Sequence, residues 1–324
     1  MFYATEHAVV VETYCETDVE WAVHTLTYLN LNQYATSTAQ PGLSVSTINE
    51  VAIPLPPIKE QRRIVSSLNK WFALINKTEQ GKIDLQTTIK HAKSKILDLA
   101  IHGKLVSQDP NDEPASELLK RINPKVEITC DNGQYRKVPF EIPCSWKWCK
   151  LKECCHIVGR IGVRGYTKDD LVTDCNGAIT LSPSNIINGV MNYDKCTFIS
   201  WRKYEESPEI QVLCGDILLV KTGSSFGKCA LVEHLPKEAT INPQFVVLKD
   251  ISIKKQFLNY VLKSNYARNN YDNFVLGTAI PTFTQVVLGN MQIPLPPLEE
   301  QYRIVAKIEE LFTSLDNIQK ALEV

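Results

Sequence analysis

A glycine-rich segment at residues 216–233, DILLVKTGSSFGKCALVE, comes closest to a nucleotide site in residue type and spacing. A P-loop needs four residues between its first glycine and Gly-Lys, then Ser or Thr, then a helix. Here three residues separate Gly223 from Gly227, Lys228 is followed by Cys229, and CALVE is typical of a strand. The spacing predicts a strand–loop–strand hairpin and argues against ATP binding.

The same loop has residues suited to phosphate contacts. Glycines let a backbone approach another molecule closely, and backbone amides, hydroxyls and lysines are the groups that contact phosphate oxygens. The candidate residues are Lys221, Thr222, Ser224, Ser225 and Lys228. A solvated hairpin loop explains the same residues, so both interpretations stay open.

A second candidate surface is GRIGVRGYTKDD, residues 159–170. Arginine can bond guanine or a phosphate with two parallel hydrogen bonds, and tyrosine can stack on a base or bond a phosphate. The candidates in this segment are Arg160, Arg164, Tyr166 and Lys168. Amide side chains of the type that read adenine edges occur at Asn242, Gln244 and Gln285. A flexible exposed loop is the competing interpretation of residues 159–170.

Four of the ten cysteines cluster at Cys144, Cys149, Cys154 and Cys155, with His156 beside them. Structural zinc usually needs close cysteine pairs matched by a second pair, and the C-x4-C-x4-CC spacing differs from that. Buried or incidental thiols are therefore favoured over zinc. No base for a cysteine nucleophile, paired carboxylates, catalytic triad or dinucleotide fingerprint stands out. We expect a chain without catalytic residues, cofactor or metal.

Composition indicates a soluble chain of about two domains. Of its 324 residues, 44% are hydrophobic and 22% are charged, and the net charge is −1. This near-neutral charge weighs against bulk electrostatic attraction to DNA but leaves room for a local basic face. There is no apolar run of membrane-spanning length and no signal-peptide pattern at the start. We therefore expect a cytoplasmic protein with reduced thiols and no membrane partner.

An internal repeat organises the chain. IPLPPIKEQRRIV at 53–65 and IPLPPLEEQYRIV at 293–305 match at ten of thirteen positions, with an offset of 240 residues. Upstream, TAQPGLS at 38–44 parallels TAIPTFT at 278–284, and YATEHAVVVE resembles EATINPQFVVLK. The first fifty residues are thus predicted to be the tail of a domain whose complete copy lies at about 110–290.

A helix is predicted after each proline-rich stretch, because proline suits the first helical turn. Apolar residues then recur at heptad spacing, which indicates two long helices that pair antiparallel in a coiled coil. The first seam comprises Ile64, Leu68, Trp71, Ile75, Leu85, Ile89, Ile96 and Leu99, and the second Ile304, Ile308, Leu311, Leu315, Ile318 and Leu322. Short β-rich runs (GAITL, DILLV, QFVVL) lie between the helices, so the predicted class is α+β: a mixed α/β domain plus long coiled-coil helices.

The two repeated stretches resemble the conserved-region signature of the DNA specificity subunit of type I restriction–modification enzymes. ILDLAIHGKLVSQDPNDEPASELLKRI at 96–122 is similar to that family's central spacer, and GTAIPTFTQVVLGNMQIPLPPLEEQ to the exit from a target-recognition domain. The resemblance covers essentially the whole chain. It implies the tail of a first target-recognition domain at 1–52, a proline-rich start and long spacer helix at 53–108, a second target-recognition domain at 109–292, and a second, shortened helix at 293–324.

In that family each target-recognition domain reads one half of a split DNA site, and the paired helices set the spacing. A helical strut can hold two such domains about 34–36 Å apart, one turn of duplex DNA. The resemblance implies double-stranded DNA, two methyltransferase subunits and motor–nuclease restriction subunits as partners. S-adenosylmethionine, ATP and Mg²⁺ would belong to those partners. The competing hypothesis is a coiled-coil assembly scaffold that reads no DNA, or an inactive truncated remnant.

The chain departs from the family pattern in two places. Its first recognition domain is represented only by a tail, and its second helix ends early. Residues 1–50 are too few to close a core of their own. We therefore expect this segment to be poorly ordered or completed by a second chain.

Overall fold

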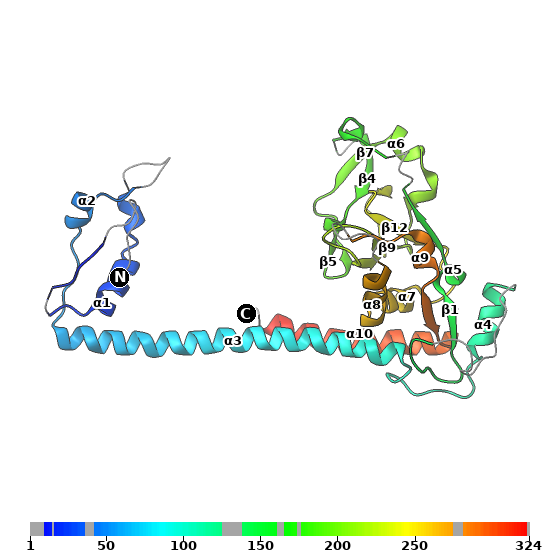
Figure 1. Ribbon diagram of the computed structural model, residues 1–324, viewed down its shortest axis with the longest axis horizontal. Helices are drawn as coiled ribbons and strands as arrows, with labels where there is room; N and C mark the ends of the chain where they lie inside the picture. Colours follow the sequence, from blue (N-terminus) through cyan, green and yellow to red (C-terminus); the bar gives the residue numbers. More distant parts are fainter. Residues whose placement is uncertain are drawn as a thin grey trace. The chain divides into compact units, whose positions relative to one another are not determined.

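The structure is a computed structural model that describes residues 10–14, 16–35, 42–124, 138–160, 165–173, 176–274 and 281–322. The chain forms two compact units, residues 1–86 and 87–324. The boundary lies inside one continuous helix, α3 (Ile58–Ile101), drawn in cyan in Figure 1. The predicted long helix is confirmed. The unit boundary differs from the predicted domain boundaries because α3 contributes its first part to one unit and its last part to the other.

The first unit holds two short helices beside the start of α3. They are α1 (Val19–Tyr28) and α2 (Val45–Asn49), with the 3-10 helix η1 (Leu31–Tyr34) between them. The Asp18 carboxylate caps α1 by accepting from Trp21 N at 3.1 Å. In the described part of this unit the buried hydrophobic side chains are Trp21 and Val65.

The second unit contains two main sheets. The four-stranded sheet is antiparallel in the order β10-β9-β12-β2, and the five-stranded sheet has the order β3-β7-β4-β11-β8 with β4 and β11 parallel. The first consists of β2 (His156–Gly159), β9 (Ile217–Val220), β10 (Cys229–Leu231) and β12 (Phe245–Lys249). The second consists of β3 (Leu171–Val172), β4 (Gly177–Leu181), β7 (Thr197–Ser200), β8 (Gln211–Val212) and β11 (Ala239–Ile241).

Two strand pairs and several helices complete this unit, so the predicted α+β class is confirmed. The pairs are β1 (Lys147–Lys150) with β13 (Gln292–Leu295), and β5 (Ile186–Ile187) with β6 (Val190–Met191). The α-helices are α4 (Ala115–Ile122), α5 (Leu151–Cys154), α6 (Trp201–Glu205), α7 (Lys255–Lys263), α8 (Asn265–Phe274), α9 (Gln285–Gly289) and α10 (Leu298–Ala321). Single-turn 3-10 helices lie at Lys168–Asp170, Pro183–Asn185 and Pro208–Ile210.

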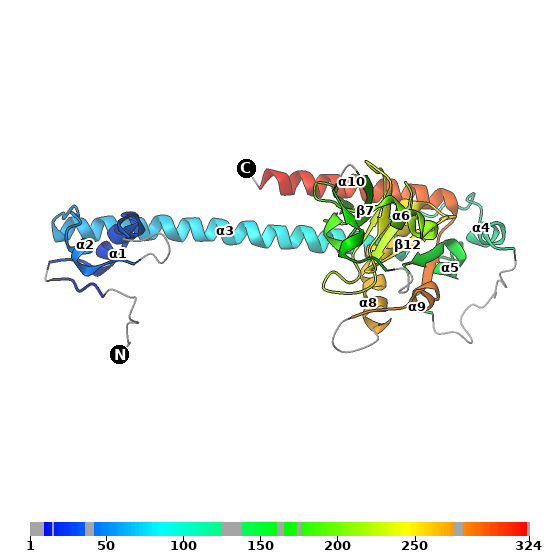
Figure 2. The ribbon, with the colours of Figure 1, turned by 90° about the horizontal axis from the view of Figure 1, so that it is seen from above.

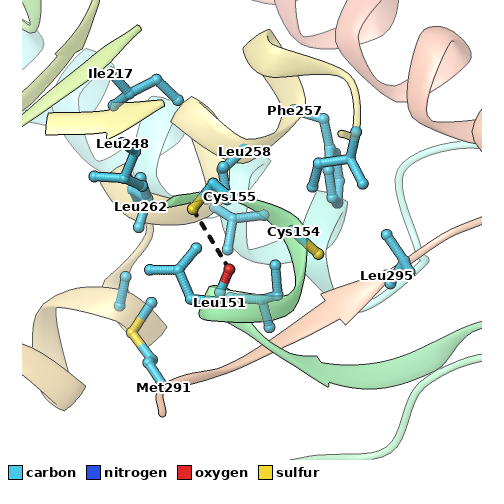
Figure 3. Close-up of a cluster of buried hydrophobic side chains, with 14 of the residues drawn as sticks. Leu151, Cys154, Cys155, Ile217, Leu248, Phe257, Leu258, Leu262, Met291 and Leu295 are labelled. Atoms are coloured by element: carbon cyan, nitrogen blue, oxygen red, sulfur yellow. Dashed lines mark hydrogen bonds between the residues drawn. The ribbon is translucent and has the colours of Figure 1, made fainter. Parts of the chain in front are cut away.

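Strand β9 explains how the two cores are connected. Its four residues, ILLV, are fully buried because both of its faces are covered. Ile217 and Leu219 face one core with the helices, whereas Leu218 and Val220 face the core shared with the five-stranded sheet. Figure 3 shows the first core, in which Ile217 lies with Leu248 of β12 and the helix residue Leu258. Because successive side chains of a strand point to opposite faces and both faces of β9 are buried, its sequence is a continuous apolar run.

Helix α10 pairs antiparallel with the last part of α3, as predicted. Figures 1 and 2 both show the two helices side by side and running in opposite directions. Lys93 of α3 forms an ion pair with Asp316 of α10, and its ammonium group lies 5.4 Å from the centre of the Phe312 ring. In the described part of the chain, no helix is both long and apolar enough to cross a membrane.

The strict heptad seam is wrong where the helices meet the domain. Leu97, Ala100 and Ile101 of α3 and Val305 of α10 are buried at positions outside the predicted seam, because a helix on a globular core buries a wider stripe than a coiled coil. Among the predicted seam residues, Ile89, Ile304 and Ile308 are buried, Leu68, Ile96, Leu99, Leu311, Leu315 and Leu322 are half-buried, and Ile64, Trp71, Ile75, Leu85 and Ile318 are exposed.

The internal repeat is also present in three dimensions. Helices α2 and α9 begin 240 residues apart, at Val45 and Gln285, as do α3 and α10, at Ile58 and Leu298. The caps of α2 and α9 are equivalent too. Ser44 accepts from the third amide of its helix, and Thr284 does the same.

A buried glutamine occupies the same position in both repeats. Gln61 Oε1 accepts from Asp18 N at 2.7 Å, and Gln301 Oε1 accepts from Lys254 N at 2.9 Å. Both backbone donors are the N-cap residues of a helix that lies earlier in the chain, α1 in one unit and α7 in the other. Each glutamine Nε2 also donates to a proline carbonyl five residues earlier, at 2.8 Å for Pro56 and 3.0 Å for Pro296. Helix α1 is therefore the counterpart of α7.

Candidate nucleic-acid interface

Several strand ends meet at one edge of the four-stranded sheet. In the antiparallel register Val220, the last residue of β9, pairs with Phe245, the first of β12, and Gly159 at the end of β2 pairs with Val246. The end of β2, the end of β9 and the turn before β12 therefore lie close together at this edge. The five-stranded sheet joins them, since Asn242 N donates to Leu181 O at the end of β4, at 2.9 Å.

The segment 221–228 is the predicted hairpin loop, because β9 and β10 pair antiparallel on either side of it. Its backbone is closed by its own hydrogen bonds, including Gly227 N to Val220 O at 2.9 Å and Phe226 N to Gly223 O at 3.0 Å. Gly223 has φ +94° and Gly227 φ +77°, conformations that favour glycine. The glycines thus allow a tight, internally bonded loop.

Aromatic packing fixes this loop to the segment before α9. The Phe226 ring lies 5.2 Å from that of Phe283, and Phe283 stacks on Tyr271 at 5.6 Å. Thr222 and Thr282 form an isolated antiparallel bridge, and Lys221 O accepts from Phe283 N at 3.3 Å. Aromatic contacts of Phe226 and backbone pairing with Thr282 and Phe283 therefore hold the loop in place.

The loop's predicted phosphate-contacting residues differ in exposure. Lys228 and Ser224 are exposed, whereas Thr222, Ser225 and Lys221 are half-buried. Burial lowers the pKa of the Lys221 ammonium group. The loop therefore offers one exposed lysine, one half-buried lysine and three hydroxyls on an internally bonded backbone.

Two glutamines lie against glycines at the same edge. A Cβ on Gly223 would lie 3.0 Å from Gln244 Nε2, and one on Gly159 would lie 2.6 Å from Gln285 Nε2. Both glutamine side chains are half-buried. We call the residues gathered here the polar edge: Lys221, Thr222, Ser224, Ser225, Lys228, Gln244 and Gln285.

The prediction that Asn242 reads a base is wrong. Its side chain is buried, and it holds the turn before β12. Asn242 Oδ1 accepts from Gln244 N at 3.0 Å, and Nδ2 donates to Gln244 Oε1 at 3.0 Å. Asn242 is therefore a structural residue that orients Gln244.

The prediction for Arg160 is also wrong. Its side chain is only 5% exposed, and it donates to Ile241 O at 3.1 Å and to Thr240 Oγ1 at 3.2 Å. Burial lowers the pKa of the guanidinium group. The Tyr166 ring lies 5.3 Å from Arg160 Cζ, and Tyr166 is half-buried. Lys168 is exposed, and Arg164 lies outside the described residues.

Sequence reasoning missed three residues of this region. Ser182 and Ser184 follow β4, directly after the carbonyl that Asn242 bonds, and their hydroxyl oxygens are 2.7 Å apart. The turn pattern LSPSN after a predicted strand could have indicated them. Val286 follows Gln285 and is 74% exposed. No sequence signal distinguishes such a valine from a core residue.

The cysteine cluster belongs to the core. Cys149, Cys154 and Cys155 are buried, while Cys144 is exposed. The sulfurs of Cys149 and Cys154 are 3.5 Å apart, and Cys155 Sγ donates to Leu151 O at 3.4 Å (Figure 3). The Cys154 contact and burial raise the pKa of Cys149 well above its usual value, and burial raises that of Cys155. Among the described residues, no three His, Cys, Asp or Glu side chains are grouped so as to hold a metal ion.

The region is chemically equipped for binding. It combines ammonium, hydroxyl and amide groups on a rigid backbone, and these are the groups that contact phosphates and base edges. The model of the type I restriction modification DNA specificity domain matches residues 1–86 and 143–324. The chain belongs to this family. The resemblance of the sequence to the DNA specificity subunit family is therefore confirmed.

Relatives of the DNA specificity domain family share most of this chain. The EcoEI specificity subunit of Escherichia coli is 26% identical over 354 residues, covering 89% of this chain and 58% of its own length. The MjaVIII specificity subunit of Methanocaldococcus jannaschii is 26% identical over 294 residues, covering 89% of this chain and 60% of its own length. The EcoprrI subunit of E. coli is 46% identical over 83 residues, 25% of this chain and 21% of the relative. The chain thus spans well under two thirds of these relatives.

Solved structures show the same fold. The HsdS subunit from Thermoanaerobacter tengcongensis has a TM-score of 0.50 at 18% identity and covers 94% of this chain and 64% of its own. A chain from a study of complex assembly and conformational transition of the type I R-M system has a TM-score of 0.57 at 19% identity, covering 94% and 63%. At these identities the likeness concerns the fold of the specificity subunit.

Proposed function

We propose that this chain is a sequence-specific DNA-binding subunit of a type I restriction–modification complex. Its second unit binds one half of a bipartite duplex site through the polar edge. The observation that carries this proposal is the convergence of two lysines, three hydroxyls and two glutamine amides on one rigid edge of a sheet. Lysines and hydroxyls position the duplex on its phosphates, and the glutamines contact base edges.

The chain has no catalytic role in this proposal. Two methyltransferase subunits bind the helices and domains, and restriction motor–nuclease subunits join them. Those partners bring S-adenosylmethionine, ATP and Mg²⁺, and the complex works in the cytoplasm, where its DNA is. Support comes from the family, because the matched relatives are specificity subunits of type I restriction enzymes.

The test is binding of the full chain to a randomised duplex library, followed by anisotropy titrations of the selected sequence at several salt concentrations. We expect affinity to fall linearly with log salt concentration. Lys228→Ala should weaken binding to all sequences and reduce the salt slope by about one, whereas Gln244→Ala should relax selectivity at one base pair. Lys104→Ala, an exposed lysine in the linker after α3, is the matched control.

Two outcomes would contradict the proposal. Binding without salt dependence or selected sequence would favour the assembly scaffold. An equal loss for Lys104→Ala and Lys228→Ala would show that general positive charge, and not the polar edge, attracts the DNA.

A further inference from the structure

A short hairpin formed by β5 and β6 (Figure 1) carries an exposed apolar pair at its tip. Asn188 and Gly189 join the strands with φ angles of 52° and 76°, which suit the tight turn of a two-residue hairpin. Ile187 and Val190 flank this turn as a cross-strand pair, and they are 52% and 61% exposed. The hairpin thus ends in two apolar side chains that face water.

The register of the hairpin explains why this pair is exposed. The neighbouring pair, Ile186 and Met191, is buried in the core shared with the five-stranded sheet. Successive side chains of a strand point to opposite faces. One pair therefore anchors the hairpin in the core, and the other pair points away from it.

The tip of the hairpin is fixed to helix α7. Lys263 Nζ donates to Gly189 O at 2.8 Å. A Cβ on Gly189 would lie 3.2 Å from Lys263 Nζ, so the glycine leaves room for the lysine to close on the turn. Burial lowers the pKa of this ammonium group. The exposed apolar pair is therefore held on a rigid support.

The hairpin borders the polar edge at both of its ends. At its base, Leu181 O accepts from Asn242 N, and β5 begins five residues after Leu181. At its tip, β6 packs against β10, and a Cβ on Gly189 would lie 3.9 Å from Cys229 O. Cys229 directly follows Lys228 of the polar edge. The apolar pair is thus continuous with the surface that the proposed function assigns to DNA.

Positive charges gather beside the tip. Burial raises the pKa of the Cys229 thiol to about 11, and the charges of Lys263 and Arg268 oppose that rise. Lys263 is used by the turn, and the charge of Glu233 acts on it as well. Lys228 and Arg268 are exposed. An exposed apolar pair bordered by exposed cations favours a polyanion that also presents apolar groups.

We propose that the β5–β6 hairpin enters the major groove of the DNA duplex, where Ile187 and Val190 contact the methyl groups of thymines in the recognised half-site. A two-stranded β-ribbon fits this groove, and an apolar contact with the C5-methyl group identifies thymine there. Lys228 and Arg268 contact phosphates beside the groove. The inference rests on the proposed function and adds the chemical group that the hairpin recognises.

The other partners fit this surface less well. The minor groove is only about 6 Å wide and displays no thymine methyl group, whereas the two strands of a ribbon are themselves about 4.8 Å apart before their side chains are added. The core of a protein–protein interface is depleted of charged residues. Here the apolar pair is small and lies beside cations.

The test uses the full chain and the duplex selected from the randomised library, with each thymine replaced in turn by uracil. The replacement removes one methyl group and keeps the base pair. Loss of one buried methyl group weakens binding about fourfold. We expect this loss at the thymines that the hairpin contacts and unchanged affinity at the others, measured by anisotropy.

Ile187→Ser and Val190→Ser identify the side chains that make these contacts. Both positions are exposed and the buried pair of the hairpin is untouched, so the fold is retained. In each variant, uracil should have no further effect at the thymine that the altered side chain contacts. Leu213→Ser is the matched control, because Leu213 is 62% exposed and precedes β9, at the opposite end of that strand from the polar edge. It should keep every uracil effect.

Arg268→Ala tests the charges beside the tip. It should weaken binding to all duplexes and reduce the salt slope by about one, while the uracil effects remain. An unchanged salt slope would contradict the placement of the hairpin in the groove.

Three further outcomes decide the inference. Uracil without effect at every thymine would overturn it, and so would uracil effects that persist in both serine variants. Unchanged DNA affinity of both serine variants would assign the apolar pair to another partner and overturn it too. In these cases Lys228→Ala would still weaken binding, so the proposed function would stand. Absence of salt-dependent binding to any duplex would instead remove the proposed function and this inference with it.

Discussion

The buried glutamine at the start of α10 offers a quantitative prediction. Gln301 is fully buried, and its side chain joins the cap of α7 to the proline-rich turn before α10. Gln301→Ala leaves Lys254 N and Pro296 O without these partners. Each unsatisfied buried backbone group costs about 1–3 kcal/mol, which gives about 2–6 kcal/mol for two such groups. Because Lys254 is only half-buried, we expect the junction to lose about 2–4 kcal/mol.

Hydrogen exchange measures this loss locally, which matters because a chain with two units does not unfold in one step. A loss of about 2–4 kcal/mol corresponds to exchange about 30- to 1000-fold faster at the amides that open with the junction. The affected amides are those at the start of α7, residues 254–258. Gln61→Ala should have the parallel effect on the start of α1, because Gln61 makes the same two bonds.

The control is Glu309→Ala, an exposed position on α10, which should change local stability by less than about 0.5 kcal/mol. Exchange at residues 254–258 that is equal in Gln301→Ala and Glu309→Ala would refute the reasoning. It would mean that apolar packing of α7 against α10, and not the glutamine, fixes the junction.

Three further predictions concern buried groups. Arg160→Ala should destabilise the second unit by about 2–3 kcal/mol in urea unfolding while leaving DNA sequence preference unchanged; altered preference would restore Arg160 as a base contact. Because the pKa of Glu300 is raised, its stabilising contribution should be complete below the ordinary glutamate pKa and lost as pH rises through the raised value. Melting of the chain and of Glu300→Gln across that range checks the sign. Iodoacetamide should label Cys144 in the native protein but Cys149 and Cys155 only after unfolding.

Features encoded locally were predictable from sequence. The continuous helix α3 follows from heptad periodicity, and the hairpin around residues 221–228 follows from glycines between two apolar runs. Arg160 and Asn242 were misassigned because their environment depends on other segments. The partners of Arg160 lie 80 and 81 residues away in sequence. The backbone N–H of Asn242 bonds Leu181 O at the end of β4, while its side chain bonds Gln244. A polar residue in a glycine-rich segment looks the same whether it is exposed or buried.

The heptad prediction also misplaced some buried residues because burial depends on other segments. Periodicity shows that a helix has an apolar stripe, but the width of the stripe depends on whether it meets one helix or a whole domain. Leu97 and Val305 are buried because α3 and α10 pack on the helical core as well as on each other. Exposed seam positions of α3 such as Trp71 and Ile75 belong to the first unit, whereas Leu97 belongs to the second.

The two buried glutamines show which parts of the repeat are retained. Gln61 and Gln301 form equivalent bonds, so each repeat keeps the joint between a long helix and the N-cap of an earlier helix, α1 or α7. The polar edge, in contrast, needs the ends of β2, β9 and β12, and in the described residues those strands occur once. The repeat therefore separates two properties of the specificity domain: where a recognition domain attaches, and what it recognises.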